Sequence, residues 1–364
     1  MKVCLVCIEF FGWGKCGGFG RATRMIGREL TRRGIETVVV VPRRQDQPAE
    51  TWVDGMQILA YTWWRPWRSL EIFRRCDANI YHSQETSMGT VLAMIAMPKR
   101  RHIITFRDHK SLSDWLIELR YPSRHRLATF LAWIYERNPF ISWAVKRADG
   151  LYCCAPYMTT KIQRTYRLKH PPGVLATAVE VPEELPRKSD HPLVVFLSRW
   201  DRRKRPQLFF ELAKLFPQVQ FLAFGRSQDE AWDQALHARY SGITNLTFAG
   251  FVDQFEDDRI WQVLSEAWIL VNTSAREGLP TAMLEALAHR CAILSHINTD
   301  RIASRFGFHA TEDDLATGLK ALLRTNAWRE KGEAGYLWVR ENFMMDQVID
   351  QHVAVYQQPN ALKA

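Results

Sequence analysis

Residues 269–286 read ILVNTSAREGLPTAMLEA, and this stretch decides the fold class of the 364-residue chain. The apolar run Ile269–Asn272 predicts a buried strand, and the residues Thr281–His289 predict a helix. Pro280 suits the first turn of that helix, because its missing N–H would be unpaired there anyway. A strand that leads through a short loop into a helix is the repeating unit of a parallel α/β sheet.

The same alternation continues on both sides of this stretch. In the second half we expect strands at residues 193–198, 219–224, 246–249 and 292–295, with helices at 207–215, 230–238, 260–266, 315–323, 328–342 and 346–357. In the first half, a strand at Lys2–Glu9, a helix at Ala22–Arg33 and a strand at Glu36–Val41 form a βαβ pattern. Further first-half strands are expected at 57–60, 78–82, 102–105 and 150–154, and helices at 127–135 and 142–146.

A proline-rich segment separates the two halves. Five prolines fall between residues 171 and 192 among charged residues, which is typical of an inter-domain linker. The predicted fold class is therefore α/β, with two Rossmann-like domains whose parallel sheets face each other across a cleft. We place the first domain at residues 1–175, the linker at 176–192 and the second domain at 193–345. Ligands of such folds bind at the carboxyl ends of the strands.

Composition and charge narrow the class of protein further. The chain is 47% hydrophobic, enough for sizeable cores, yet it holds no apolar run of about 18 residues that would span a membrane. Its seven scattered cysteines, an odd number, predict reduced, buried thiols in a cytoplasmic protein. Residues 1–188 hold 30 Lys and Arg against 17 Asp and Glu, whereas residues 189–364 hold 19 against 22. The basic half suits a phosphorylated acceptor or an acidic membrane surface, and a solvated basic surface is the alternative.

Two carboxylates frame the start of the helix in the deciding stretch. Glu277 lies in the loop after the strand, and Glu285 lies about one turn into the helix. The helix N-terminus between them presents N–H groups and the positive end of the helix dipole, which suit a phosphate. Carboxylates on either side of a diphosphate can accept hydrogen bonds from sugar hydroxyls. An acidic residue at a helix start, followed by a solvated glutamate, is the alternative.

A group of cations follows the strand at residues 193–198, where the sequence reads RWDRRKRP from Arg199 to Pro206. Cations at a strand end can neutralise the charge that grows on a diphosphate leaving group. Arg199 and Lys204 are the candidates for this role. For Arg202, Arg203 and Arg205 we favour an exposed basic loop.

The glycine-rich segment Gly17–Gly20 lies between the first strand and the first helix, where glycines let a backbone approach a ligand closely. It also suits the dinucleotide-binding turn of an NADP-dependent oxidoreductase. The strand Glu36–Val41 is followed by Arg43 and Arg44, with no acidic residue for a ribose hydroxyl. NADP is thus an alternative ligand, although it leaves the second half of the chain unexplained.

Together these motifs resemble the retaining GT-B glycosyltransferases, especially glycosyltransferase family 4. Glu277 and Glu285 have the spacing of the E-x7-E motif of that family, and Arg199 and Lys204 have the spacing of its cation pair. The resemblance implies that Glu277 contacts the hydroxyls of the transferred sugar, that Glu285 holds the ribose and that the two cations stabilise the diphosphate. It implies further donor contacts at Gly18, Gly225, Val252, Gly278, Leu279 and Pro280.

The resemblance covers most of the chain and is looser in the first half. By resemblance, the helix 346–357 crosses back to complete the first domain, which would be the acceptor side. Arg107 occupies the position of a usual histidine after the strand 102–105, and His109 lies two residues later. Either is a candidate for contact with the sugar or the acceptor. The segment Tyr61–Arg68 interleaves aromatic residues and arginines, which suits a loop at the acceptor, a loop at a membrane or the packed edge of a core.

We therefore expect a retaining glycosyltransferase that moves a hexose-type sugar from a nucleoside-diphosphate sugar to a hydroxyl of a glycan or lipid-linked acceptor. The resemblance favours UDP over GDP or ADP as the nucleotide. The chain has no Asp-x-Asp motif and no recognised nucleic-acid module, so neither a metal, a further cofactor nor a nucleic acid is expected. We expect it in the cytoplasm, peripheral at the inner face of the membrane. A non-catalytic sugar-nucleotide-binding scaffold and the NADP-dependent oxidoreductase are the alternatives.

Overall fold

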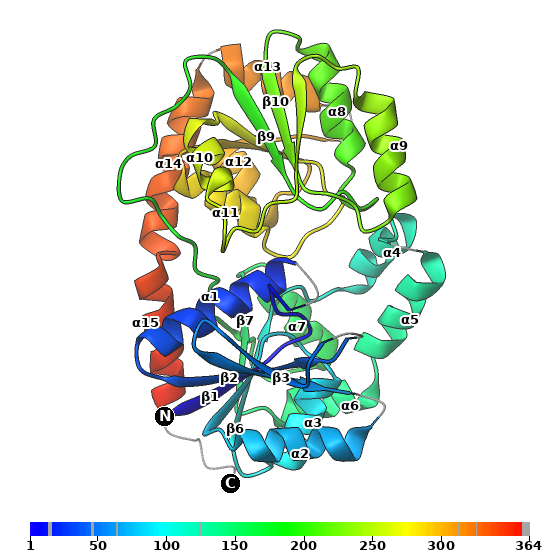
Figure 1. Ribbon diagram of the computed structural model, residues 1–364, viewed down its shortest axis with the longest axis vertical. Coiled ribbons are helices and arrows are strands. Elements are labelled where there is room, and N and C mark those ends of the chain that lie inside the picture. Colours follow the sequence, from blue (N-terminus) through cyan, green and yellow to red (C-terminus); the bar gives the residue numbers. More distant parts are fainter. Residues whose placement is uncertain are drawn as a thin grey trace. The chain divides into compact units, whose positions relative to one another are not determined.

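A computed structural model describes residues 1–13, 17–44, 47–62, 65–123, 125–311, 314–324 and 326–358. The contacts divide the chain into two compact units. Unit 1 comprises Met1–Ser111, Ala132–Ala178 and the described residues from Met345 onward, and unit 2 comprises Leu112–Leu131 and Val179–Met344. Each unit contains one sheet of mostly parallel strands with helices around it (Figure 1), so the predicted α/β class with two Rossmann-like sheets is confirmed.

The sheet of unit 1 has eight strands in the order β3-β4-β2-β1-β5-β6-β7-β8. Its strands are β1 (Lys2–Val6), β2 (Glu36–Pro42), β3 (Glu50–Val53), β4 (Met56–Tyr61), β5 (Ile80–Ser83), β6 (Arg101–Phe106), β7 (Gly150–Cys153) and β8 (Gly173–Val174). Its helices are α1 (Gly18–Arg32), α2 (Pro66–Cys76), α3 (Met88–Ala96), α6 (Pro139–Arg147), α7 (Met158–Tyr166) and α15 (Met345–Gln357). Helix α5 (Arg126–Glu136) runs from unit 2 into unit 1.

Both faces of this sheet are buried, which explains the continuous apolar runs Val3–Val6 in β1 and Val38–Val41 in β2. Val3 and Leu5 of β1 pack against α1 and α15 on one face. Cys4 and Val6, which alternate with them, pack against α2 and α3 on the other face. The six cysteines among the described residues are free and buried, as predicted, and Cys16 lies outside the described residues.

One edge of the sheet breaks the parallel pattern. Strand β3 pairs antiparallel with β4 through a tight hairpin at Asp54 and Gly55. Both turn residues have positive φ angles, 51° and 77°, which is the backbone of a two-residue type I′ hairpin. The Asp-Gly pair is a sequence signal for such a hairpin, and our sequence analysis missed it.

The C-terminal helix α15 is anchored deep in unit 1. The hydroxyl of Tyr356 lies 2.7 Å from Nδ1 of His82 on β5, and the opposite ring nitrogen of His82 lies 2.7 Å from Oγ1 of Thr105. Arg101 donates to the backbone carbonyl of Tyr356 over 3.1 Å. At the other end of α15, Asp346 accepts a hydrogen bond of 2.8 Å from Arg33 at the end of α1. The last helix of the chain therefore contributes to the core of the first unit.

The sheet of unit 2 has six strands in the order β11-β10-β9-β12-β13-β14, and all the neighbours are parallel. Its strands are β9 (Leu193–Leu197), β10 (Gln220–Phe224), β11 (Leu246–Gly250), β12 (Ile269–Asn272), β13 (Ala292–Ser295) and β14 (Gly307–His309). Its helices are α4 (Leu112–Arg120), α8 (Pro206–Leu215), α9 (Glu230–Tyr240), α10 (Arg259–Glu266), α11 (Thr281–Ala288), α12 (Ile302–Phe306), α13 (Leu315–Arg324) and α14 (Ala327–Asn342), with a short 3₁₀ turn, η1, at Thr299–Arg301.

The proline-rich segment before β9 carries no helix and no strand of its own from residue 175 to residue 192. It is nevertheless fastened to unit 2 through Lys188. The ammonium group of Lys188 donates to the backbone carbonyls of Leu264, Ala267 and His289 at 3.1, 2.5 and 2.5 Å. Burial lowers the pKa of this lysine. These contacts fix the chain immediately before the first strand of unit 2.

Two segments of unit 1 differ from their predicted form. The expected loop at Gly17–Gly20 is shorter than predicted, because α1 begins at Gly18, and Gly20 donates its N–H to the carboxylate of Glu9 over 3.2 Å. The expected loop Tyr61–Arg68 is not one loop, because Tyr61 ends β4 and α2 begins at Pro66. Pro66 is well placed at the first helical position, where a missing N–H costs nothing. Trp63 and Trp64 lie outside the described residues.

Candidate active site

The strand order of unit 2 brings three of the predicted loops to one edge of the sheet. Strand β9 lies between β10 and β12, so the segment after β9, which carries Arg199 and Lys204, is flanked by those that carry Gly225 and Glu277. Parallel strands place all their carboxyl ends on the same edge. The residues that the sequence separates by up to 78 positions are therefore neighbours in the fold.

The ammonium group of Lys204 forms a direct ion pair with Oε1 of Glu277. The hydroxyl of Ser274 donates to the same oxygen over 2.7 Å. Both charged side chains are nearly buried, with 11% of the Lys204 side chain and 14% of the Glu277 side chain exposed. Burial alone would raise the pKa of Glu277, but the charges of Lys204 and Arg203 outweigh it and lower the pKa to about 2. Glu277 is thus ionised at neutral pH, and an ionised carboxylate only accepts hydrogen bonds.

The loops that carry this ion pair are tied together by Thr273 and Arg205. The hydroxyl of Thr273 donates to the backbone carbonyls of Lys204 and Arg205 at 2.7 and 3.0 Å. In return, the guanidinium of Arg205 donates to the carbonyl of Thr273 over 2.7 Å. A further backbone bond of 2.9 Å joins the N–H of Ala275 to the carbonyl of Arg203. The two loops therefore behave as one rigid piece that holds Lys204 against Glu277.

The prediction of an exposed basic loop is wrong for Arg203 and Arg205, and it holds for Arg202. Arg205 is 9% exposed, because its guanidinium is bonded to the carbonyls of the neighbouring loop. Arg203 forms an ion pair of 2.5 Å with Glu118. Arg202, in contrast, lies at the surface and pairs with Asp229 over 3.0 Å.

Glu118 on α4 is a residue that sequence reasoning missed. Its Oε1 accepts from Arg203 at 2.5 Å and from Arg276 at 3.0 Å, and the glutamate is only 5% exposed. Arg203 and Arg276 are direct neighbours of Lys204 and Glu277 in the chain. Glu118 therefore fastens both candidate loops from a helix that is 85 and 158 positions away in sequence. No local sequence pattern could have indicated this arrangement.

Gly225, after β10, lies so close to the backbone of Ser198, the residue before Arg199, that no side chain fits at its position. Its φ angle is +119°, and a Cβ atom at this position would lie 1.9 Å from the carbonyl oxygen of Ser198. Its N–H donates to the carbonyl of Gly250 over 2.8 Å, which links the ends of β10 and β11. Val252, two residues beyond β11, is buried with 6% exposure. The structure therefore places both predicted donor contacts at the same sheet edge as the ion pair.

Helix α11 begins at Thr281, with Pro280 as the residue before it. Gly278 and Leu279 form the connection between Glu277 and this helix. Glu285 lies inside the helix and is 3% exposed. The N–H groups in the first turn of an α-helix have no partner within the helix, so this turn is suited to an anion.

Arg199 is more accessible than Lys204, the other cation predicted to bind the diphosphate. Its side chain is 37% exposed, and its guanidinium lies 3.6 Å from Oδ2 of Asp201. The neighbouring Trp200 is fully buried and donates its indole N–H to the carbonyl of Phe224 over 3.2 Å. The buried tryptophan thus fixes the backbone from which the arginine projects.

The remaining predicted residues belong to unit 1. Gly18 is the first residue of α1, and the carboxylate of Glu9 lies at the start of this helix, where it accepts from Gly20. A Cβ atom on Gly17 would lie 2.2 Å from Oε1 of Glu9. Because a carboxylate already lies at this helix start, a phosphate there would have to share the site with a negative charge.

Arg107 and His109 are both buried and bonded within unit 1. The guanidinium of Arg107 donates to Oε1 of Gln84, over 3.1 Å from Nε, and to Oγ1 of Thr177 over 2.8 Å. Burial lowers the pKa of Arg107. The Nε2 atom of His109 lies 2.9 Å from Oγ1 of Thr165. Each side chain therefore has a structural role that is independent of any ligand.

Two family profiles match the chain and together cover most of it. The profile of "Glycosyltransferase Family 4" matches residues 16–181, and that of "Glycosyl transferases group 1" matches residues 179–302. The chain belongs to glycosyltransferase family 4. It is accordingly an enzyme that uses a nucleotide-sugar donor, which sets aside the oxidoreductase and the non-catalytic scaffold. No functionally curated protein matches the sequence.

Solved structures confirm the fold over nearly the whole chain. The sucrose-phosphate synthase of Thermosynechococcus elongatus is 15% identical, with a TM-score of 0.74 and 98% of each chain covered. HepE of Anabaena, solved with UDP and glucose, is 13% identical, with a TM-score of 0.73 over 98% of this chain and 99% of the other. The pneumococcal O-GlcNAc transferase GtfA, solved with UDP and GlcNAc, is 9% identical, with a TM-score of 0.71 over 98% of each chain. The family 4 glycosyltransferase described above thus has the GT-B fold.

Proposed function

We propose that this family 4 glycosyltransferase is a retaining enzyme that moves a hexose-type sugar from a UDP-sugar to an acceptor hydroxyl. The observation that carries the proposal is the ion pair of Lys204 and Glu277, held beside the start of α11 at the carboxyl ends of β9 and β12. This ion pair holds a cation that can bind the diphosphate beside an ionised carboxylate that can bind the sugar. UDP is preferred over GDP and ADP, and the solved structures of HepE and GtfA with UDP support that choice.

In the proposed site, Arg199 and Lys204 bind the diphosphate and neutralise the charge that grows on it as the glycosidic bond breaks. The first turn of α11, entered through Gly278, Leu279 and Pro280, adds backbone N–H groups to the same anion. These groups act most strongly on the leaving diphosphate, because its negative charge increases in the transition state.

The sugar and the nucleoside are held by acceptors on either side of the diphosphate. Glu277 accepts from hydroxyls of the transferred sugar, and Glu285 accepts from the ribose. Gly225 and Val252 line the place of the base. Gly18 at the start of α1 is a further candidate contact for the phosphates, which would have to share that helix start with the carboxylate of Glu9. The acceptor hydroxyl attacks the anomeric carbon on the face from which the diphosphate leaves, and a phosphate oxygen takes its proton. This route retains the anomeric configuration and needs neither a protein nucleophile nor a metal.

We also propose that residues 1–175, completed by the helix 346–357, form the acceptor-side domain, and that residues 193–345 form the donor domain after a linker at 176–192. The segment Leu112–Leu131 is the exception, because its contacts assign it to unit 2. The acceptor is a glycan or a lipid-linked sugar. Arg107 and His109 are candidates for acceptor contact, although both are bonded inside unit 1. Either would have to exchange its present partner, Thr177 or Thr165, for the ligand.

The test of the proposed donor is thermal stabilisation of the purified protein by UDP, GDP, ADP and NADP, each added to the native chain and to Lys204→Ala. We expect UDP to raise the melting temperature of the native chain and to have little effect on the variant. Stabilisation by NADP alone, or equal stabilisation of both proteins by UDP, would contradict the proposed site. Proton NMR of the first sugar released in slow donor hydrolysis then tests retention, and activity in the presence of EDTA tests independence from a metal.

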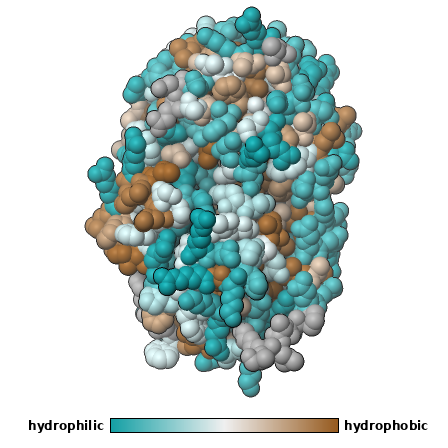
Figure 2. Space-filling model, turned by 180° about the vertical axis from the view of Figure 1, so that it is seen from behind, coloured by the Kyte–Doolittle hydropathy of each residue, from teal (hydrophilic) through white to brown (hydrophobic). Residues whose placement is uncertain are grey.

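We further propose that the enzyme is cytoplasmic and binds the inner face of an anionic membrane. Among the described residues, no helix is both long and apolar enough to cross a membrane. Helix α5, however, buries none of its residues, and Leu127, Phe130, Leu131 and Ile134 lie on one face of it with 64, 42, 55 and 52% exposure. Figure 2 shows apolar side chains gathered in one area on the side of the molecule where this helix lies. An exposed apolar face of this kind is typical of a helix that lies in a membrane interface.

Vesicle sedimentation tests this contact. We expect the native chain to bind vesicles that contain phosphatidylglycerol and to bind pure phosphatidylcholine weakly. The double variant Phe130→Ser and Ile134→Ser should lose most of the binding. The matched control is Trp52→Ser, which removes an apolar side chain of 66% exposure from β3. Equal loss in the control, or no loss in the double variant, would contradict a role of α5.

A further inference from the structure

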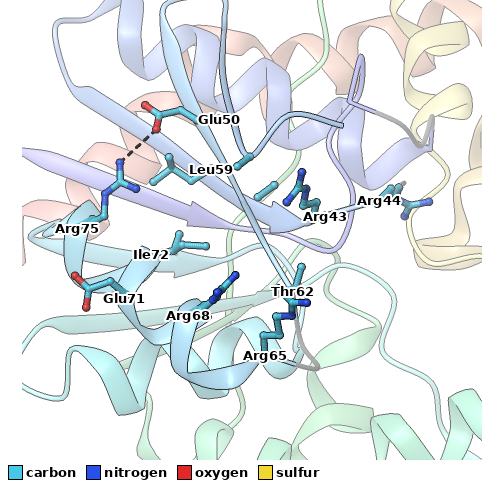
Figure 3. Close-up of a pocket in the computed structure, with 12 residues that line it drawn as sticks. Arg43, Arg44, Glu50, Leu59, Thr62, Arg65, Arg68, Glu71, Ile72 and Arg75 are labelled. Carbon is cyan, nitrogen blue, oxygen red and sulfur yellow. Dashed lines mark hydrogen bonds and ion pairs between the residues drawn. The ribbon is translucent and has the colours of Figure 1, made fainter. Parts of the chain in front are cut away.

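Unit 1 contains an open pocket of about 580 Å³ at the edge of its sheet. The pocket lies where β2 and β4 end and α2 begins. Arg43 and Arg44 come from the segment after β2, and Arg65 and Arg68 come from the start of α2 (Figure 3). Arg75, two turns further along α2, completes the set. Five arginine residues therefore line one hollow.

The carboxylates in this pocket neutralise only part of its charge. Glu50 and Glu71 are the two acidic residues that line it. Glu50 accepts from Arg75 over 3.3 Å, and Glu71 pairs over 3.7 Å with Arg74, which lies outside the pocket lining. Among the described residues, the guanidinium of Arg43 donates only to the backbone carbonyl of Gln47, over 3.2 Å. Within the described part of the chain, the four arginines other than Arg75 therefore have no ion pair with a carboxylate.

The position of these cations is unfavourable for the protein itself. Arg65 is the residue before α2, and Arg68 lies in its first turn, which carries no acidic residue. The N-terminus of a helix is the positive end of its dipole, so cations there destabilise the helix. The side chain of Arg65 forms no cap on the helix; only its backbone carbonyl contributes, by accepting from the N–H of Ser69 over 3.1 Å and from the hydroxyl of Ser69 over 3.2 Å. Stability of the fold therefore does not account for these two arginines.

A multiply charged anion would relieve all of these unfavourable features. Guanidinium groups bind phosphate oxygens in a bidentate fashion, and several of them converge wherever proteins bind phosphorylated groups. The dipole of α2 would add a favourable interaction with the same anion. A neutral sugar would gain little from so many charges. None of the residues proposed above for the donor lines this pocket.

We propose that the arginine pocket binds a phosphate or diphosphate group of the acceptor, so that this glycosyltransferase acts on a phosphorylated substrate. The acceptor role of the group rests on the proposed function, whereas binding of the anion itself does not. The same chemistry could be offered by a soluble sugar phosphate, by a lipid-linked diphosphate or by the headgroup of an anionic lipid. The binding assays below distinguish the soluble group from the membrane surface.

The experiment is calorimetric titration of the full chain with inorganic pyrophosphate, with UDP present at saturation so that the donor site is occupied. Three proteins are compared: the native chain, the pocket variant Arg65→Ala with Arg68→Ala, and a control variant Arg164→Ala with Lys169→Ala. The control removes the same charge from exposed positions at α7 that do not line the pocket. We expect the pocket variant to bind pyrophosphate at least about tenfold more weakly than the other two proteins. Equal binding by all three proteins, or no binding by any, would overturn the proposal.

Two further measurements are made on the same three proteins. Vesicle binding distinguishes a soluble phosphate from a lipid headgroup, and thermal stabilisation by UDP tests the proposed donor site independently of the arginine pocket. If the pocket variant loses binding to phosphatidylglycerol vesicles as well as to pyrophosphate, the phosphate of a lipid headgroup also occupies the pocket. If only pyrophosphate binding is lost, a soluble or lipid-linked phosphate is the ligand. Thermal stabilisation by UDP should be the same in all three proteins, which shows that the variants are folded. If UDP stabilises none of them while pyrophosphate binding still depends on Arg65 and Arg68, the donor assignment fails and the anion pocket stands.

Discussion

The ammonium group of Lys204 and the carboxylate of Glu277 form an ion pair across two loops that are 73 positions apart in the sequence. The contact has two consequences. It keeps Glu277 ionised, with a pKa of about 2, and it holds Lys204 at the end of β12 beside the start of α11. Because each residue positions the other, the proposed sugar contact and the proposed diphosphate contact are coupled.

Loss of Lys204 should therefore abolish most of the transfer activity. We expect Lys204→Ala to lower kcat/KM by about 100-fold or more, because the leaving diphosphate loses a cation and Glu277 loses its partner. Steady-state kinetics with the UDP-sugar measures this. Arg202→Ala is the control, since Arg202 lies in the same loop but pairs with Asp229 at the surface. Similar kinetics for both variants would contradict the role of Lys204.

Glu118 should stabilise the two loops that carry Lys204 and Glu277 without itself contacting the donor. Glu118→Gln removes the negative charge with which Arg203 and Arg276, two poorly exposed cations, both form ion pairs. Removing one partner from a buried ion pair costs about 3–5 kcal/mol. We expect a lower free energy of unfolding in urea and a weaker affinity for UDP.

The control for Glu118 is Glu211→Gln, because Glu211 pairs with Lys214 and Arg239 at the surface. Surface ion pairs contribute at most about 1 kcal/mol, so this variant should behave like the native chain. If Glu118→Gln is as stable as the control and binds UDP normally, the ion pairs of Glu118 with Arg203 and Arg276 contribute little to stability or to UDP binding.

Gly225 should tolerate no side chain. Gly225→Ala would place a Cβ atom 1.9 Å from the carbonyl oxygen of Ser198, at a φ angle of +119° that L-residues rarely adopt. We expect a loss of at least about 2 kcal/mol in the free energy of unfolding, together with weaker UDP binding, because Arg199 follows Ser198 directly. Gly242→Ala is the matched control, since nothing lies within 4 Å of its Cβ position. Equal stability of the two variants would refute the steric argument.

The stability of the protein should fall as the pH is lowered from 7.5 to 5.5. Burial, with a contribution from Lys188, lowers the pKa of His289 to about 3, and burial with the charge of Arg107 does the same for His352. The pKa of His82 is also lowered by burial. Below the unfolded pKa of about 6.5, the unfolded chain takes up protons that the folded chain does not, so the unfolded state is favoured as the pH falls.

At pH 5.5, each such histidine lowers the free energy of unfolding by about 1.4 kcal/mol relative to high pH. Urea unfolding at several pH values measures the slope. His289→Gln should be less stable at pH 7.5, because its ring stacks on Trp261, but should show a shallower loss on acidification. An identical slope for the native chain and the variant would show that His289 is not buried in its neutral form.

Many elements of the fold were predictable because their signals are local. The strand Ile269–Asn272 and the strand Ala292–Ser295 were predicted with their observed bounds, since each is a short apolar run between a helix and a loop. The hairpin β3–β4 and the start of α2 were missed. The hairpin includes the edge strand β3, and α2 begins shortly after β4. At both places turn chemistry rather than an apolar pattern decides the structure.

The candidate site divides in the same way. The sequence by itself determined which residue types follow which strands, because Arg199, Lys204, Gly225 and Glu277 each stand next to a recognisable strand. Only the tertiary structure decided that Lys204 pairs with Glu277, that Glu118 holds the arginines beside them, and that five arginines share one pocket. Such pairings depend on the order of strands in a sheet and on the packing of distant helices, and these are set by burial of the whole core rather than by any local run of residues.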